Sequence, residues 1–345
     1  MAIFTSSVKS DQTTCLINER KYFVDVGFTR DRKPGDFDIY YECEFNNSAT
    51  ISSPDINLAN EQNENVTEIG GHNIKNLEYL PVDIVNSFPM IKKFTIYKTS
   101  LKAISKKNFR GLRHLVHLSL SFNQISSIDE NTFDDQVKVI NIRLDDNKLT
   151  TLPSKVFSKL SNLDSLFLNK NQLTTLDAEI FANNLNLALL FLDNNNLASF
   201  APGTFDSLTK LRQFWFNNNE ISSLDSELFK NCVSVVDVTG SENKIIEIPV
   251  DLISTMTSLR EFSFSQNPLN SVIDFKVFEH NKKITDISLS EIKFTKIYNI
   301  DVIDNLPDLK FVNFEIDNES CIVGSFYKET LEKLKQEVKA NCSTE

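Results

Sequence analysis

The chain has 345 residues, of which 41% are hydrophobic, and a formal net charge of −11 at pH 7. The acidic balance argues against a surface for nucleic acid or anionic membranes, because phosphates are bound by clustered lysines and arginines. The sequence has no glycine-rich phosphate motif, no histidine or cysteine spacing typical of zinc sites and no apolar run long enough for a membrane span, so none of these features is expected.

The N-terminal 65 residues carry no repeat and are expected to form a cap. Two stretches of alternating polarity, residues 21–28 and 38–45, lie on either side of a turn at Pro34. This pattern is typical of two antiparallel strands, so we predict a β-hairpin.

A repeat of 24 residues fills the chain from about residue 66 to 317. An asparagine recurs at this unbroken spacing, and every position is counted from it below: Asn123, Asn147, Asn171, Asn195, Asn219, Asn243 and Asn267. Apolar residues occupy −8, −5, +2 and +5, and usually −3. Position −14 carries a phenylalanine in six units: Phe109, Phe133, Phe157, Phe181, Phe205 and Phe229. At the ends the register decays and places Thr99 and His72, then Ile292 and Asp317, at the asparagine position, which gives about eleven units.

The two columns predict one continuous structure. The apolar residues at −5 and −3 alternate as in a short strand, so successive units would stack their strands in parallel. An asparagine side chain both donates and accepts, so a ladder of asparagines would satisfy backbone groups where each coil turns inward. The phenylalanines would pack as a spine on the other side. Because no unit buries its apolar side alone, the prediction is a single solenoid.

Each unit reads LxxLxLxxNxLxxLxxxxFxxL, which closely resembles the typical class of extracellular leucine-rich repeat. The resemblance implies an α/β solenoid, a right-handed horseshoe with a parallel β-sheet on its concave face and disulfide caps at its ends. Arthropod secreted and cell-surface proteins of innate immunity and cell adhesion are similar in repeat type, and Toll-like ectodomains share the repeat. The resemblance therefore implies a non-enzymatic protein that binds a partner.

By the same resemblance, residues 1–65 and 318–345 are expected to be disulfide-linked caps. The implied bridges are Cys15–Cys43 and Cys321–Cys342, and the second pair brackets an amphipathic helix predicted over residues 327–338. Glycosylation sequons occur in or beside the caps at Asn46, Asn65, Asn318 and Asn341. Together these features predict secretion. The first residues contain no apolar signal-peptide core, which leaves an intracellular scaffold as the alternative.

Two residues interrupt the apolar columns. Cys232 lies three residues after Phe229, where other units carry leucine, so we expect a buried thiol. Gly240 occupies position −3, and the neighbouring units carry Phe216 and Phe264 there. Large side chains on either side of a vacancy predict volume compensation in the core. A hinge at Gly240 is the alternative.

The candidate binding site lies on the concave face, which positions −6 and −4 would line. Phe167, Phe191 and Trp215 occupy −4 on three consecutive strands, and exposed apolar patches of this kind usually mark binding sites. The surrounding candidates are Arg143, Leu189, Gln213, Asp193 and Asp237. An aromatic anchor with an acidic border suits a protein or peptide partner with apolar and basic groups. The alternatives are a glycan stacked on the rings, or rings that pack only on one another.

Catalysis and metal binding are not expected. His117 and Ser119 would share one strand, with Asp145 on the next unit, but side chains two apart on a strand start about 7 Å from each other. The Asp145-Asp146 pair lacks the spacing of a calcium loop. No cofactor is predicted, and the expected function is extracellular protein binding.

Overall fold

The computed structural model describes residues 88–294 and 296–316, the segments 67–72, 77–80, 82 and 84–86, and the strand segments 2–4, 15–21, 39–45 and 324–327. The chain divides into two compact units, Met1–Lys148 and Leu149–Glu345. Within the described residues, no helix has the length and apolar character needed to cross a bilayer.

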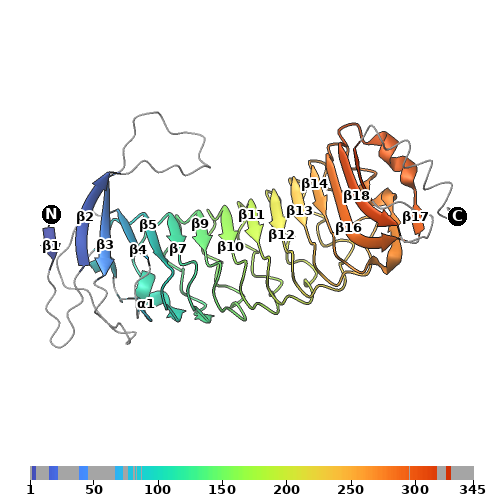
Figure 1. Ribbon diagram of the computed structural model, residues 1–345. Helices are drawn as coiled ribbons and strands as arrows, with labels where there is room; N and C mark the ends of the chain where they lie inside the picture. Colours follow the sequence, from blue (N-terminus) through green and yellow to red (C-terminus); the bar gives the residue numbers. More distant parts are fainter. Residues whose placement is uncertain are drawn as a thin grey trace. The chain divides into compact units, whose positions relative to one another are not determined.

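The first unit contains an antiparallel sheet followed by a parallel one (Figure 1). The antiparallel sheet consists of β1 (Ala2–Phe4), β2 (Cys15–Lys21) and β3 (Ile39–Phe45). The parallel sheet runs in chain order through β4 (Glu68–His72), β5 (Lys93–Tyr97), β7 (His117–Ser119) and β9 (Asn141–Arg143). Its other elements are the short parallel pair β6 (Ala103–Ile104) and β8 (Ser127–Ile128), the 3-10 helix η1 (Ile84–Asn86) and the one-turn helix α1 (Lys106–Phe109).

The second unit stacks one short strand per repeat, and Figure 1 shows these strands side by side from green to orange. The parallel strands are β10 (Ser165–Phe167), β11 (Leu189–Phe191), β12 (Gln213–Trp215), β13 (Asp237–Thr239), β14 (Glu261–Ser263), β16 (Asp286–Phe294) and β18 (Phe311–Ile316). Strand β19 (Gly324–Tyr327) pairs antiparallel with β18. The remaining elements are the parallel pair β15 (Val272–Asp274) and β17 (Lys296–Tyr298) and the 3-10 helices η2 (Leu269–Ser271), η3 (Phe275–Phe278) and η4 (Ile300–Asn305). The predicted solenoid of stacked parallel strands is confirmed.

The strand register follows the predicted 24-residue repeat except in the first repeat of the chain. Glu261 pairs with Asp286 and Asp286 with Phe311, so the last two steps are 25 residues long, as expected. At the other end His72 pairs with Tyr97, which lies at −2, so the prediction of His72 at the asparagine position is wrong. The cause is Gly71, which is buried at −3, where every later repeat except that of Gly240 carries a large apolar side chain. The first repeat therefore lacks half of its apolar pattern.

The phenylalanine column forms the predicted spine within each unit. All six rings are 0–1% exposed, which places them in the core. In the second unit the ring centroids of Phe157 and Phe181 lie 6.4 Å apart, those of Phe181 and Phe205 6.3 Å, and those of Phe205 and Phe229 5.9 Å. Each coil therefore packs its aromatic ring on the ring of the next coil.

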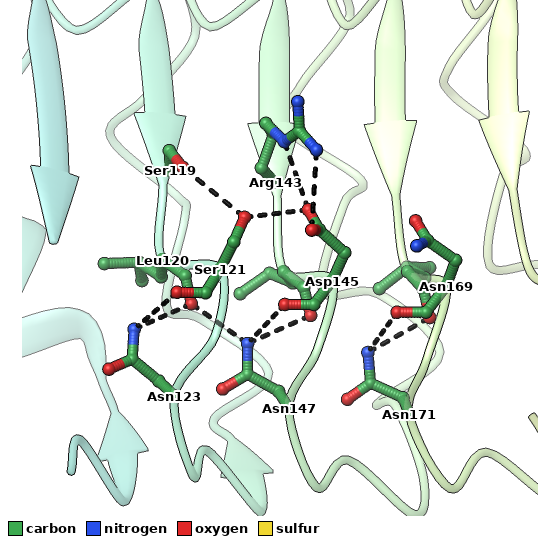
Figure 2. A network of polar contacts seen from close by, with 11 residues as sticks. Ser119, Leu120, Ser121, Asn123, Arg143, Asp145, Asn147, Asn169 and Asn171 are labelled. Carbon is green, nitrogen blue, oxygen red and sulfur yellow. Dashed lines mark hydrogen bonds and ion pairs between the residues drawn. The ribbon is translucent and has the colours of Figure 1, made fainter. Parts of the chain in front are cut away.

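The repeated asparagines are buried and tie adjacent coils together. The amide of Asn147 donates to the carbonyls of Leu120, 2.9 Å away, and Leu144, 3.1 Å away (Figure 2). Its oxygen accepts the backbone N–H of Ile125 at 3.0 Å. The same three bonds recur in the second unit at Asn195, Asn219, Asn243 and Asn267. Buried backbone groups need such partners, so each side chain satisfies two coils at once.

The residue before the asparagine position turns the chain at the end of each strand. The backbone of this residue is left-handed in eight repeats, with φ between 51° and 56°: Lys98, Phe122, Asp146, Lys170, Asn194, Asn218, Glu242 and Gln266. Glu291 has φ of 58° and precedes Ile292, which agrees with the expected register there. The turn is thus a property of the repeat and is kept even where the residue is not glycine or asparagine.

A further buried column, at position −11, alternates between apolar residues and hydrogen-bond donors. Its members from Leu112 onward are Leu112, Gln136, Leu160, Asn184, Leu208, Cys232, Met256 and Asn281, all at most 1% exposed. The donors reach back to the preceding coil: the Asn184 amide lies 3.0 Å from the Phe157 carbonyl, and Cys232 Sγ 3.7 Å from the Phe205 carbonyl. Cys232 is a free, buried thiol, as predicted, and burial raises its pKa to about 12.

Gly240 makes room for an aromatic ring. A Cβ atom at this residue would lie 2.4 Å from Cζ of Phe216, which no side chain tolerates. The rings of Phe216 and Phe264, two coils apart, meet edge to face with centroids 5.8 Å apart. The predicted volume compensation is confirmed, and the alternative of a hinge has no support in this packed contact.

At the N-terminal end, β2 and β3 form the expected antiparallel pair. The second strand agrees with the prediction, whereas the first lies at Cys15–Lys21 and the stretch 22–28 falls outside the described residues. The register pairs Cys15 with Phe45 and Ile17 with Cys43, so the two cysteines lie on adjacent strands. Their bridge remains a prediction, because their side chains fall outside the described part.

At the C-terminal end, Tyr327 ends strand β19, so the expected helix does not begin there. The remainder of that helix, over 328–338, lies outside the described residues, as do Cys321, Cys342, Asn46, Asn65, Asn318 and Asn341.

Candidate functional site

The exposed face of the parallel sheet, called the sheet face here, is formed by positions −6 and −4. In the second unit it carries Phe167 on β10, Phe191 on β11 and Trp215 on β12, in direct register. We call these three residues the aromatic strip. The repeat places them there because each alternates with a buried residue of its strand, so their side chains must point away from the core.

The rings of the aromatic strip pack on one another and remain partly open. Phe167 and Phe191 stack with ring centroids 4.9 Å apart, and the rings of Phe191 and Trp215 meet edge to face with centroids 4.5 Å apart. Phe191 is only 7% exposed, whereas Phe167 and Trp215 are half-buried. The strip is therefore a pre-packed apolar platform whose two outer members face solvent.

Beside the strip, at position −6, lie Leu189 and Gln213, both half-buried. Each precedes a ring residue by two positions on its own strand, so both share the sheet face with the strip. They widen the platform with one apolar and one amide side chain.

Asp237 anchors the indole of Trp215. The indole Nε1 donates to Oδ2 of Asp237 at 2.8 Å, diagonally across from β12 to β13. Asp237 is 7% exposed, and its other oxygen, Oδ1, is buried without a hydrogen-bond partner. Burial raises the pKa of this carboxyl to about 6; the Trp215 bond opposes the rise, and the nearby carboxylates of Glu261 and Asp193 add to it.

Asp193 belongs to a polar chain along position −2. Its Oδ1 accepts the backbone N–H of Asn217 at 2.9 Å and the side-chain amide at 2.7 Å. Asn217 in turn accepts the backbone N–H of Ser241 at 2.8 Å and donates to the hydroxyl of Thr239 at 2.7 Å. Burial raises the pKa of Asp193, although both Asn217 bonds oppose the rise. The sequence analysis missed Asn217 and Ser241, for which the only signal is the run of small polar residues at −2.

Arg143 lies in the first unit, where it pairs with an acid at position −2. Its Nε is 3.1 Å from Oδ1 of Asp145, which is 2% exposed and also accepts from the Ser121 hydroxyl at 2.7 Å (Figure 2). The hydroxyl of Ser119 lies 3.5 Å from that of Ser121. Asp145 therefore holds a local polar network, which is a structural role.

Metal binding has no geometric support in the part of the chain that the structure describes. There, no group of three or more histidine, cysteine, aspartate or glutamate residues is arranged to hold a metal ion.

Comparisons with known proteins agree with this architecture. The model of the family described as "BspA type Leucine rich repeat region (6 copies)" matches residues 83–197 and 190–301. Among solved structures, the chain is similar to one in the "Crystal structure of TLR13-ssRNA13 complex", with a TM-score of 0.63 and 20% identity over 72% of this chain and 39% of that one. It is also similar to a chain of the "Octameric complex of Latrophilin 3 (Lec, Olf), Unc5D (Ig, Ig2, TSP1) and FLRT2 (LRR)", with a TM-score of 0.58 and 21% identity over 73% of this chain and 82% of that one.

The chain thus spans well under half the length of the first of these structures. At 20 and 21% identity, the likenesses show a shared fold. No curated protein matches the chain.

Proposed function

The chain belongs to the BspA type leucine-rich repeat family, and we propose that it is a non-enzymatic protein that binds a protein or peptide partner on its sheet face. The observation that carries the proposal is the aromatic strip. Phe167 and Trp215 keep half-buried rings on a face whose other side chains are largely polar. Exposed aromatic clusters are costly to maintain in water and are typical of interface anchors.

The packing of the strip favours a binding role over a purely stabilising one. Stacking on Phe191 and the hydrogen bond to Asp237 hold the outer rings in fixed positions. Binding of a partner would therefore cost little side-chain entropy in the strip, because its rings are already held in place. The mixed polar surroundings supply the rim that a protein interface needs.

We further propose that the protein is secreted and acts in innate immunity or cell adhesion. The predicted caps and the four sequons support secretion. The similar solved structures include one complex with RNA and one with other proteins. A protein partner fits this chain better, because Asp237 and Glu261 on the sheet face, and Asp193 beside it at position −2, would repel phosphates.

A triple substitution of the strip tests the binding site. The strip variant carries Phe167→Ser, Phe191→Ser and Trp215→Ser, and circular dichroism first establishes that it folds like the native protein. The native protein and the strip variant are then used as paired baits to capture partners from the extracellular fluid of the organism that produces the protein. We expect a partner that the native bait retains and the strip variant loses.

A matched control distinguishes loss of the binding site from a general loss of exposed apolar surface. Leu185, Val233 and Ile246 are exposed apolar residues outside the strands of the sheet face, at 56%, 46% and 44% exposure. The control variant changes all three to serine and should retain the same partner. Equal retention by all three baits would show that the strip has only a structural role.

A glycan ligand is the second candidate, and one observation favours it. Next to Trp215, the sheet face continues with the hydroxyl groups of Thr239 and Ser263, and the hydroxyl of Ser241, at position −2, lies 2.9 Å from that of Ser263. A ring beside a row of hydroxyls suits the apolar face and the polar edge of a sugar. Competition by soluble glycans, with little effect of salt, would favour this candidate over a protein partner.

Expression in a eukaryotic host tests secretion against the alternative of an intracellular scaffold. A secreted protein should carry glycans at the sequons, and peptide mapping without reduction should recover the two cap bridges. Free thiols at all four cap cysteines would favour the scaffold.

A further inference from the structure

We infer that the partner places a basic side chain, arginine or lysine, beside Trp215 on a column of acidic residues that continues the aromatic strip. This acidic column comprises Asp237, Glu261 and Asp286 at position −6 of β13, β14 and β16. The inference rests on the proposed function and specifies the chemistry of its partner.

The strand register brings the three carboxylates together. Asp237 pairs with Glu261, and Glu261 pairs with Asp286. Neighbouring strands lie about 4.8 Å apart, so three negative groups follow one another along the same edge of the sheet face. Among the described residues none of the three makes an ion pair, and no metal-binding cluster occurs. The column therefore presents negative charge that the described part of the protein does not neutralise.

The buried member of the column carries an unsatisfied acceptor. Oδ2 of Asp237 is bonded to the indole of Trp215, and Oδ1 has no partner although it is buried. A carboxylate is planar, so Oδ1 lies on the side of the group away from the indole bond, and the next strand in register carries the exposed side chain of Glu261. Leaving a buried charged acceptor unpaired is unfavourable, and a donor brought by a ligand would relieve that cost.

A basic side chain satisfies each of these groups. Its positive charge would form charge-assisted hydrogen bonds with Glu261 and Asp286 and would offset the negative charge of Asp237 beside them. The apolar stem of an arginine or lysine would lie along the strip.

Other ligands fit the acidic column less well. A phosphate group or nucleic acid would meet three carboxylates and no compensating cation on them. A neutral glycan would leave the charges unpaired. The net charge of −11 also favours association with basic partners.

A random dodecapeptide library displayed on phage is the probe for this inference. Peptides are selected on the native protein and counter-selected on the strip variant, so that only peptides dependent on the strip remain. Their affinities are then measured by calorimetry with synthetic peptides, each alongside a version in which neutral citrulline or acetyl-lysine replaces the basic residue.

The column variant carries Asp237→Asn, Glu261→Gln and Asp286→Asn, which remove the charges and keep the shapes of the side chains. Its matched control carries Glu247→Gln, Asp251→Asn and Glu279→Gln, three exposed acids outside the strands of the sheet face. Both variants change the net charge by the same amount, so nonspecific attraction is equal. Circular dichroism establishes that each folds.

We expect strip-dependent peptides to be enriched in arginine or lysine. They should bind the column variant at least about tenfold more weakly and the control with less than about twofold change. Strip-dependent peptides that lack basic residues, or that bind the column variant as tightly as the native protein, would overturn the inference and leave the proposed function intact. A selection that yields no strip-dependent peptide would overturn both.

Discussion

Replacing Asp237 with asparagine is expected to stabilise the protein at neutral pH. The folded chain buries this carboxyl beside Trp215 and leaves Oδ1 without a partner. Asparagine keeps an oxygen that accepts the indole N–H, and its amide can donate to the neighbouring carboxylate of Glu261. The substitution therefore removes a buried negative charge while it retains the hydrogen bond that holds the ring.

The size and pH dependence of the effect follow from the pKa. Burial raises the pKa of Asp237 from 3.8 to about 6. A group whose pKa is higher in the folded state favours folding below its unfolded pKa, and this contribution is lost as the pH rises through the folded pKa. A rise in pKa from 3.8 to about 6 means that the ionised carboxylate costs at most about 3 kcal/mol of stability above pH 6. We expect Asp237→Asn to gain about 1–3 kcal/mol at pH 7.5 and no more than about 0.6 kcal/mol at pH 4.

Urea unfolding followed by circular dichroism, at both pH values, measures this difference. Glu247→Gln serves as the control, because Glu247 is exposed and should show no change in unfolding free energy at either pH. An asparagine variant that is no more stable than the native protein at pH 7.5, or that gains equally at pH 4, would refute the reasoning. The predicted gain would also show that Asp237 is kept at a cost to stability, as at many binding sites.

Three further predictions concern the core. Gly240→Ala should destabilise the protein by about 1–3 kcal/mol in urea unfolding, because its Cβ would overlap the ring of Phe216. Gly70→Ala is its control, since a Cβ there meets nothing within 4 Å, and equal stability of both variants would contradict the packing argument. Asn219→Ala should cost about 3 kcal/mol or more in the same assay, because it leaves buried carbonyls and an N–H without partners; a cost below about 1 kcal/mol would show the ladder to be dispensable. Cys232 should react with a thiol reagent only on unfolding, since it is 0% exposed and its pKa is about 12, and rapid labelling of the folded protein, located by mass spectrometry, would disprove this.

The buried residues of each unit could be predicted because the same pattern recurs in every repeat. The asparagine and phenylalanine columns recur with constant spacing, so one misread unit is corrected by its neighbours. The same reasoning predicted the contact across Gly240, since Phe216 and Phe264 hold the same position in flanking units. Where the pattern loses a member, as at Gly71, the register was misjudged by two residues at His72.

The aromatic strip was predictable as a set of residues, but its chemistry was not. The bond from Trp215 to Asp237 joins position −4 of one strand to −6 of the next, and it depends on the rotamers of two side chains. The periodicity of the sequence places both residues on one face, but it contains no information about which rotamers their side chains adopt. The raised pKa of Asp237 follows from the resulting burial, so it too could be found only in three dimensions.

The alternation at position −11 gives the buried column a period of two coils. Every donor in that column reaches back to a coil whose own member is apolar, as Asn184 does over Leu160. Deleting a single 24-residue coil such as 161–184 would bring Leu160 next to Leu208 and break the alternation, whereas deleting 161–208 would place Leu160 before Cys232 and preserve it. In this column the structural repeat is therefore a pair of coils, 48 residues long from Leu112 to Met256, rather than the single coil.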